Sequence, residues 1–164
     1  MEKIKNRLPV GLKFNNPLNI KREVNNHWLG KDEKNLAMLE KFNSVFYGFR
    51  AAFKLIRKAV RWRGYNTLRK LIMMWAPAKE NGQEIMMQYI YFVADNLNIS
   101  PDTKLNYRNK EQMCDIVYWM MIFESGHAKC MLEDNYRGEH YIISYPAGMK
   151  RVIGKSYDII EKEG

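Results

Sequence analysis

The sequence predicts a mainly α-helical protein that folds as a single domain of about five helices with little or no β-sheet. Apolar residues recur every three or four positions in several separate segments, and capping residues before these segments and Gly or Pro after them mark helix ends. A chain of 164 residues with 46% apolar side chains can bury one core but is too short for two ordinary domains. We therefore treat residues 1–164 as one unit, with an Asn-rich loop region (10–43), a helical core (44–126), and a loop with a C-terminal helix (127–164).

The loop region, residues 10–43, is rich in Asn, Gly and Lys and shows no sustained periodicity. This composition favours turns, so we expect an ordered loop with at most short strands. Helical patterning begins only after it.

The first long helix is expected between Ser44, which can cap it, and Gly64, which ends it. Its core-facing residues are Phe46, Phe49, Phe53, Ile56 and Val60. A second helix is expected over Leu68–Trp75. It must stop before Pro77, because a residue that precedes proline avoids helical geometry.

Two further helices complete the predicted core. Asn81 is expected to cap a third helix, whose core-facing residues are Ile85, Tyr89, Phe92, Val93 and Leu97. Asn109 is expected to cap a fourth, which runs to Glu124 and ends at the helix C-cap Gly126. Its core-facing residues are Met113, Ile116, Val117, Met120 and Met121.

After the fourth helix we expect a polar loop over residues 127–140. The apolar segment 141–143 that follows can be a strand or merely extended. A last helix is expected after Pro146, with Met149, Val152, Ile153, Tyr157 and Ile160 on one face.

Glu124 takes the next position on the apolar stripe of the fourth helix. A carboxyl group held against apolar surroundings is harder to ionise, so its pKa can rise from about 4.3 toward about 6, where it can donate a proton at neutral pH. The position also fits an exposed residue in the last turn before a C-cap. Pattern alone leaves both interpretations open.

The segment Asn15-Asn16-Pro17-Leu18-Asn19-Ile20 brings three amide side chains together, and Trp28 follows. Amides bind hydroxyl and N-acetyl groups while an aromatic ring covers the apolar face of a sugar, so this region suits a carbohydrate site. Asn-rich turns also satisfy their own backbone, which is the structural alternative.

The net charge is +9, from 27 Lys and Arg against 18 Asp and Glu. Cations are densest at Lys54, Arg57, Lys58, Arg61, Arg63, Arg69 and Lys70. A polyanionic partner is expected, and nucleic acid and an anionic bacterial envelope attract a basic protein by the same physics. A helix face that is simply solvated also explains such a run.

The sequence lacks the motifs of several kinds of functional site. There is no P-loop, dinucleotide fingerprint or zinc spacing, so we expect no cofactor and no metal. Cys114 and Cys130 are expected to be unpaired thiols, the second in the loop after the fourth helix. No apolar stretch reaches the roughly 18 to 20 residues of a membrane span, and we expect no signal peptide and synthesis in the cytoplasm.

The amide and aromatic motifs extend into a longer series. It comprises residues 15–20, Trp28-Leu29-Gly30, Phe42, Tyr47-Gly48-Phe49-Arg50-Ala51, Leu55, Thr67-Leu68, Trp75-Ala76-Pro77, Asn81, Tyr89-Ile90 and Glu124-Ser125-Gly126. Over residues 11–126 this series resembles a family of phage virion structural proteins with a lysozyme-like domain. The resemblance implies a lysozyme-like fold and a protein that is associated with a phage, in the virion or released to the bacterial envelope.

A second resemblance concerns mechanism. Residues 15–30, 42–51 and 76–89 are similar to the part of bacterial cell-wall glucosaminidases that follows their catalytic glutamate. The triplet Glu124-Ser125-Gly126 resembles the one near the catalytic acid of lytic transglycosylases, which lies early in their domain. Together these resemblances imply a circularly permuted lysozyme-like domain, with the catalytic helix moved toward the C-terminal side.

The function that these resemblances imply is cleavage of peptidoglycan by a muramidase, glucosaminidase or lytic transglycosylase. Glu124 would be the general acid and base. The candidate substrate-binding residues are Asn16, Asn19, Trp28, Trp75, Asn81, Tyr89 and Ser125. Possible second carboxylates are Glu80, Glu84, Asp32 and Glu133. Nothing in the sequence singles one out, which favours one glutamate assisted by a group of the substrate.

Two other functions compete. The first is a non-catalytic virion or envelope-binding protein that keeps a lysozyme-like fold. The second is a basic helical protein that binds nucleic acid. The partners expected under the enzymatic hypothesis are glycan strands of peptidoglycan, the anionic envelope and other virion proteins.

Overall fold

The computed structural model describes residues 8–163, which form seven helices and one two-stranded antiparallel sheet. The elements are α2 (Val10–Lys13), α3 (Val45–Trp62), α4 (Leu68–Trp75), α5 (Ala78–Asn81), α6 (Gln83–Leu97), α7 (Lys110–Glu124), β1 (Cys130–Tyr136), β2 (Glu139–Tyr145) and α8 (Met149–Lys162). The prediction of a mainly α fold is confirmed. The expected five helices become seven because α2 and α5 are single turns, and a small sheet is added.

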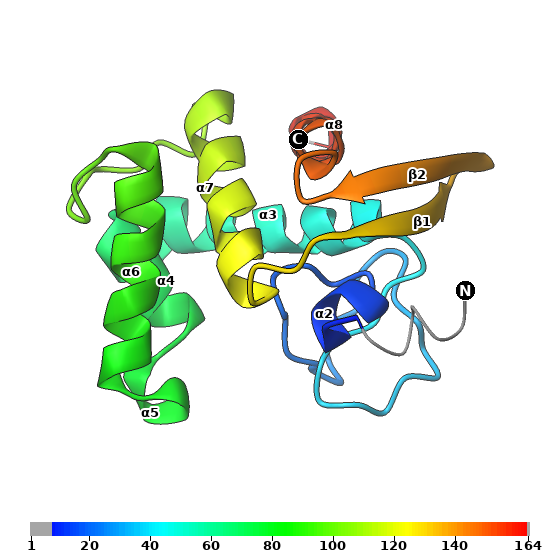
Figure 1. The fold of residues 1–164 in the computed structure, drawn as a ribbon, viewed down its shortest axis with the longest axis horizontal. Helices are drawn as coiled ribbons and strands as arrows, with labels where there is room; N and C mark the ends of the chain where they lie inside the picture. Colours follow the sequence, from blue (N-terminus) through cyan, green and yellow to red (C-terminus); the bar gives the residue numbers. More distant parts are fainter. Residues whose placement is uncertain (1–7, 164) are drawn as a thin grey trace.

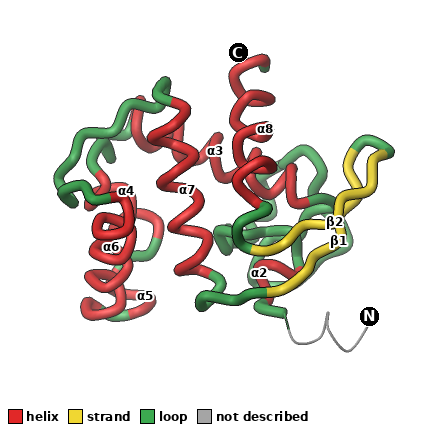
Figure 2. The backbone as a smooth tube through the Cα atoms, turned by 45° about the horizontal axis from the view of Figure 1, so that its top comes forward, coloured by secondary structure: helices red, strands yellow, loops and turns green. Residues whose placement is uncertain are grey.

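The elements lie on two sides of α7. Figure 1 shows α4, α5 and α6 on one side, and α2, the loop region and the hairpin on the other. Helix α3 passes behind α7, and α8 packs against both α3 and α7. Figure 2 shows that a short loop joins the end of α7 to β1 and that a turn joins β2 to α8.

The loop region is held together by buried side chains. The Asn16 side chain is fully buried, and its Nδ2 donates to the backbone oxygens of Ile20 and Glu40, both at 2.8 Å. Its Oδ1 accepts from the Ile20 backbone nitrogen at 2.9 Å. Isolated bridges then join Lys21 to Leu39 and Lys31 to Phe42. These bonds give the Asn-rich segment one fixed shape.

Helix α3 forms as predicted. The Ser44 hydroxyl accepts from the Phe46 backbone nitrogen at 3.1 Å and caps the helix. The five predicted core residues are all buried: Phe46, Phe49, Phe53, Ile56 and Val60. The Asp134 carboxylate of β1 accepts from the Ser44 hydroxyl at 2.8 Å and from the Val45 backbone nitrogen at 3.0 Å, so the hairpin is joined to the start of α3.

The turn between α4 and α6 differs from the prediction. Helix α4 has the predicted bounds, and Thr67 caps it. Asn81 does not cap α6, because it is the last residue of α5, and the N-cap of α6 is Gly82. Pro77 cannot continue α4 but can begin a new turn, and Gly82 takes a φ of 90° that separates α5 from α6.

The expected polar loop over residues 127–140 is also wrong. Half of it is β1, which pairs with β2 from Cys130 opposite Tyr145 to Tyr136 opposite Glu139. Cys130 therefore opens a strand, and both cysteines are free thiols. The connecting residues Arg137 and Gly138 both have positive φ, which matches the twist of the strands that they join.

Helix α7 buries the five residues predicted to face the core: Met113, Ile116, Val117, Met120 and Met121. Gly126, with a φ of 64°, allows the chain to leave the helix as predicted. Helix α8 likewise buries Met149, Val152, Ile153, Tyr157 and Ile160. Within residues 8–163, no helix combines the length and the apolar character that crossing a membrane requires.

Candidate active site

Glu124, the last residue of α7, lines a pocket of about 360 Å³. One wall comes from α2 and the loop region, and the other comes from the end of α4 and from α5. The other lining residues are Pro9, Val10, Gly11, Asn19, Lys21, Leu39, Trp75, Ala76, Glu80 and Asn81. The last residue of the apolar helix thus lies where two parts of the chain, far apart in sequence, meet.

The Glu124 side chain is partly enclosed. Burial raises the pKa of its carboxyl from 4.5 to about 7, and a hydrogen bond from Asn19 opposes this rise. None of the ion pairs within residues 8–163 involves Glu124. A carboxyl with this pKa carries its proton in about half of the molecules at neutral pH, so it can act as an acid there.

Asn19 positions the end of α7. Its Nδ2 donates to the Glu124 backbone oxygen at 3.2 Å and to the carboxylate Oε2 at 3.5 Å. Asn19 has a φ of 55°, and a side chain at Gly11 would overlap the Asn19 amide. The absence of a side chain at Gly11 therefore lets Asn19 approach Glu124.

Two more of the predicted residues, Trp75 and Asn81, line the same pocket. The Trp75 Nε1 donates to the Leu18 backbone oxygen at 3.0 Å, which holds the partly exposed ring against the loop region. Trp75 also lines an adjoining pocket of about 330 Å³ that extends to Lys58 and Arg63. The two pockets share Asn19, Lys21, Trp75 and Glu80, so they form one groove.

The remaining predicted residues lie outside the groove lining. Asn16 is fully buried and uses its amide within the loop region. Ser125 is buried, donates to the Ile122 backbone oxygen at 3.1 Å and accepts from the Tyr145 hydroxyl at 2.6 Å. Half-buried Trp28 packs against the core.

Tyr89 lies beneath the site rather than in it. It is buried and stacks on Phe123 with ring centroids 4.2 Å apart. Burial, and secondly the nearby Glu124 charge, raise the pKa of Tyr89 well above its usual value. Its phenol therefore stays neutral and forms part of the apolar support behind Glu124.

Sequence reasoning did not identify Lys21 or place Glu80 in the site. Lys21, from the loop region, forms an ion pair with Glu80 of α5, and both line the groove. The position of Glu80, three residues after Pro77, was the available local signal, because a proline that ends one helix can begin a short turn. Nothing local signals the pairing with Lys21.

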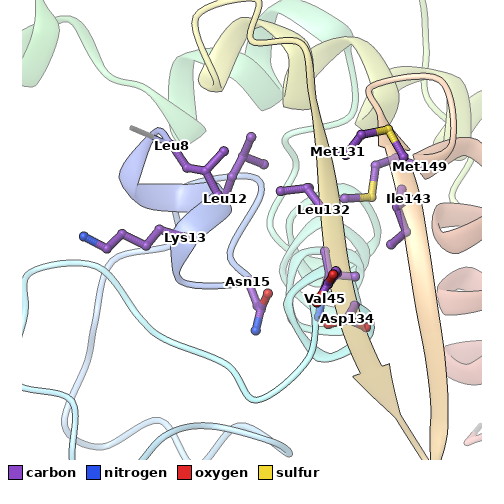
Figure 3. A pocket seen from close by; sticks show the side chains of 11 residues that line it. Leu8, Leu12, Lys13, Asn15, Val45, Met131, Leu132, Asp134, Ile143 and Met149 are labelled. Atoms are coloured by element: carbon purple, nitrogen blue, oxygen red, sulfur yellow. Dashed lines mark hydrogen bonds between the residues drawn. The ribbon is translucent and has the colours of Figure 1, made fainter. Parts of the chain in front are cut away.

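A separate cavity of about 170 Å³ lies between α2 and the hairpin. Figure 3 shows Leu8 and Leu12 on one side of it and Met131 and Leu132 of β1 on another. Its buried acid, Asp134, already accepts hydrogen bonds at the start of α3, and burial raises its pKa. We interpret this cavity as part of the hairpin packing.

Within residues 8–163, no cluster of three or more His, Cys, Asp or Glu side chains is arranged to hold a metal ion. The pocket beside Glu124 instead combines a half-buried carboxyl whose pKa is raised, the Lys21–Glu80 ion pair, two amides and an indole. The structure is thus that of a mainly α protein in which Glu124 lines a groove of mixed polar and apolar groups.

Comparison with known proteins shows similarity to a phage protein. No protein family matches the chain. Over 104 aligned residues, the chain is 36% identical to Protein P5 of Pseudoalteromonas phage PM2. The alignment covers 62% of this chain and 63% of that protein. The chain thus spans less than two thirds of the length of this relative. Similarity to a phage protein is confirmed, whereas no lysozyme-like family is shown.

Proposed function

We propose that the protein is a phage-associated glycosidase with a lysozyme-like fold that cleaves glycan strands of bacterial peptidoglycan. The observation that carries this proposal is the position of Glu124. Its carboxyl lines a groove, has a pKa of about 7 and is contacted by the Asn19 amide. The resemblance to phage virion proteins with a lysozyme-like domain, and the similarity to a phage protein, support the choice of substrate.

In the proposed reaction the protonated Glu124 carboxyl gives its proton to the glycosidic oxygen as the bond to C1 lengthens. The positive charge that develops on the sugar is stabilised by the carboxylate that remains. Asn19 contacts Oε2 and the backbone oxygen of Glu124, so it holds the carboxyl toward the groove. Burial keeps part of the Glu124 carboxyl protonated at neutral pH, and the hydrogen bond from the Asn19 amide limits how far the pKa of Glu124 rises.

The groove provides groups that suit a sugar chain. The exposed part of the Trp75 ring can cover the apolar face of a pyranose, and Asn81 offers an amide for hydroxyl or acetamido groups. The scissile linkage can be that of a muramidase, of a glucosaminidase or of a lytic transglycosylase. The excess of positive charge, +9, draws the protein to the anionic envelope.

The test is Glu124→Gln on purified peptidoglycan, with released fragments measured by mass spectrometry. The amide keeps the shape of the side chain but has no proton to donate, so activity should fall by at least about 100-fold. Wild-type activity should also decline above about pH 7, as the acid ionises. Glu84→Gln, an exposed change on α6, is the matched control and should leave activity intact.

The outcomes separate the alternatives. Retained activity in Glu124→Gln would contradict the assignment of the acid. A wild-type protein that binds peptidoglycan but releases no fragments would identify a non-catalytic binder. A defined complex with nucleic acid that dissociates steeply with salt would identify the basic-protein alternative.

A further inference from the structure

The pocket that Glu124 lines contains a second carboxylate. Of the four acids that the sequence could not rank, Glu80 lines the same pocket as Glu124. Asp32 is in the loop region near Lys41, at 3.9 Å, and Glu84 is exposed on α6. Glu133 lies on the hairpin, where it lines the separate cavity. The structure thus distinguishes acids that are equivalent in sequence.

We infer that Glu80 is the base of the proposed reaction, which accepts a proton from the attacking water while Glu124 protonates the leaving oxygen. This inference rests on the proposed function and makes it more specific, because it selects hydrolysis by water over attack by a group of the substrate. It also selects inversion of configuration at C1, since water attacks the face opposite to the leaving group.

Backbone geometry fixes Glu80 in the groove. Pro77 ends the α4 segment, and the Glu80 backbone nitrogen donates to the Pro77 oxygen at 3.0 Å in the single turn of α5. Gly82 then turns the chain into α6, which packs on α5. The acid is therefore presented by a short turn braced against a long helix, and not by a free loop.

Lys21 holds the Glu80 side chain from the opposite wall. The two residues form an ion pair between the loop region and α5, and Asn19, two residues before Lys21, contacts Glu124. One short segment of chain thus contacts both acids. The Glu80 side chain remains 34% exposed, so water and a ligand can reach it.

The surroundings of the two acids suit opposite roles. Glu124 is half-buried at the end of an apolar helix and forms no ion pair within residues 8–163, whereas Glu80 is partly solvated and paired with a lysine. Two carboxyl groups in one site with such different environments are the usual arrangement for an acid and a base.

The proposed step balances as a hydrolysis. The bond between C1 and the glycosidic oxygen breaks, its electron pair stays on the oxygen, and the Glu124 proton moves to that oxygen. The water oxygen bonds to C1 and its proton moves to the Glu80 carboxylate. Afterwards Glu124 is ionised and Glu80 is protonated, and exchange with solvent restores both groups.

The experiment replaces Glu80 and supplies another nucleophile. On purified glycan strands, Glu80→Ala should lose at least about 100-fold in rate. Sodium azide should restore part of the rate and yield a glycosyl azide detectable by mass spectrometry, because the small anion attacks C1 without needing a base. Glu84→Ala should retain the wild-type rate and gain nothing from azide. Glu124→Ala should be inactive with or without azide, because the leaving oxygen still lacks its proton.

Two results would overturn the role of Glu80. One is a Glu80→Ala variant that keeps the wild-type rate. The other is a wild-type product whose first-formed anomer, observed by NMR, retains the configuration of the substrate. Glu80→Gln preserves the size of the side chain and its ability to form hydrogen bonds, so it should fold like the wild type. It should be as inactive as Glu80→Ala, because the amide cannot accept the proton. An inactive wild-type protein would instead contradict the proposed function itself.

Discussion

At the scale of single residues, the surroundings of Glu124 explain both its raised pKa and the loss of folding stability that its ionised form causes. Its carboxyl ends the apolar stripe of α7 and is supported from behind by Tyr89 and Phe123. Water cannot stabilise the anion well there, so the proton is kept to about pH 7. The same effect makes the ionised form costly for the fold.

This cost predicts how stability depends on pH. The folded pKa of about 7 lies above the unfolded value of 4.5, so the contribution of Glu124 is fully present below pH 4.5 and is lost as pH rises through 7. The difference corresponds to an upper limit of about 3 kcal/mol. Glu124→Gln lacks the titration. In urea unfolding it should match the wild type near pH 4 and be more stable at pH 8, whereas a constant difference across pH would contradict the shift.

At the scale of elements, the hairpin is fixed to both neighbouring helices. Asp134 of β1 accepts hydrogen bonds at the start of α3. Tyr145 of β2 bonds to the Ser125 hydroxyl at 2.6 Å and to the Met121 backbone oxygen at 3.2 Å, at the end of α7. The residue next to Glu124 is therefore an anchoring point of the hairpin.

Tyr145→Phe tests this connection. It removes a buried hydroxyl and leaves the groups on α7 without their partner, which should cost about 1–3 kcal/mol in the free energy of unfolding. Tyr141→Phe is the matched control, because the Tyr141 hydroxyl bonds only to the exposed Glu139. Urea unfolding measures both variants. Equal losses would show that the contact with α7 stabilises the fold no more than a surface bond.

Local pattern predicted the helices better than the turns and strands. Helices α3, α4, α7 and α8 follow from apolar residues at helical spacing, since each buries one face. Strand β1 was not predicted because its buried positions include an acid: Asp134 and Tyr136 are buried and alternate with the exposed Glu133 and Asn135, so the segment reads as polar throughout. The boundary between α5 and α6 was not predicted, because it depends on a positive φ at Gly82 and not on a capping side chain at Asn81.

The candidate site was predictable in part for similar reasons. Glu124 was identified because it extends an apolar stripe, and Asn19, Trp75 and Asn81 belong to motifs of the resemblance. The pairing of Lys21 with Glu80 joins residues 59 positions apart and leaves no local signature. Asn16 and Ser125 share the residue types of a sugar site, but only the fold shows that their polar atoms bond to the protein interior.

At the scale of the whole molecule, the groove is a boundary between two parts of one chain. Helices α4 and α5 form one wall, and α2 with the loop region forms the other, while α7 contributes Glu124 between them. The direct polar links between these walls are the Trp75 bond to Leu18 and the Lys21 pair with Glu80. Relative movement of the walls would therefore change the distance between the two acids.

The overall charge predicts salt-sensitive attachment to the envelope. The protein has a net charge of +9, and Glu124→Gln removes none of its cations. This variant should bind sedimented peptidoglycan at about 50 mM salt and largely dissociate at about 500 mM, because exposed charges are screened. Cell walls stripped of their anionic polymers should retain less protein. Binding that is unchanged by both treatments would show that the groove, and not the charge, holds the protein on the wall.

The turn of the hairpin offers a practical use. Arg137 and Gly138 lie at the far end of β1 and β2, and Figure 1 shows this tip pointing away from α5 and from the end of α7. A short epitope or a fluorophore inserted at such a tip would leave the groove untouched. The tip is thus a place to label the protein and follow where it is located.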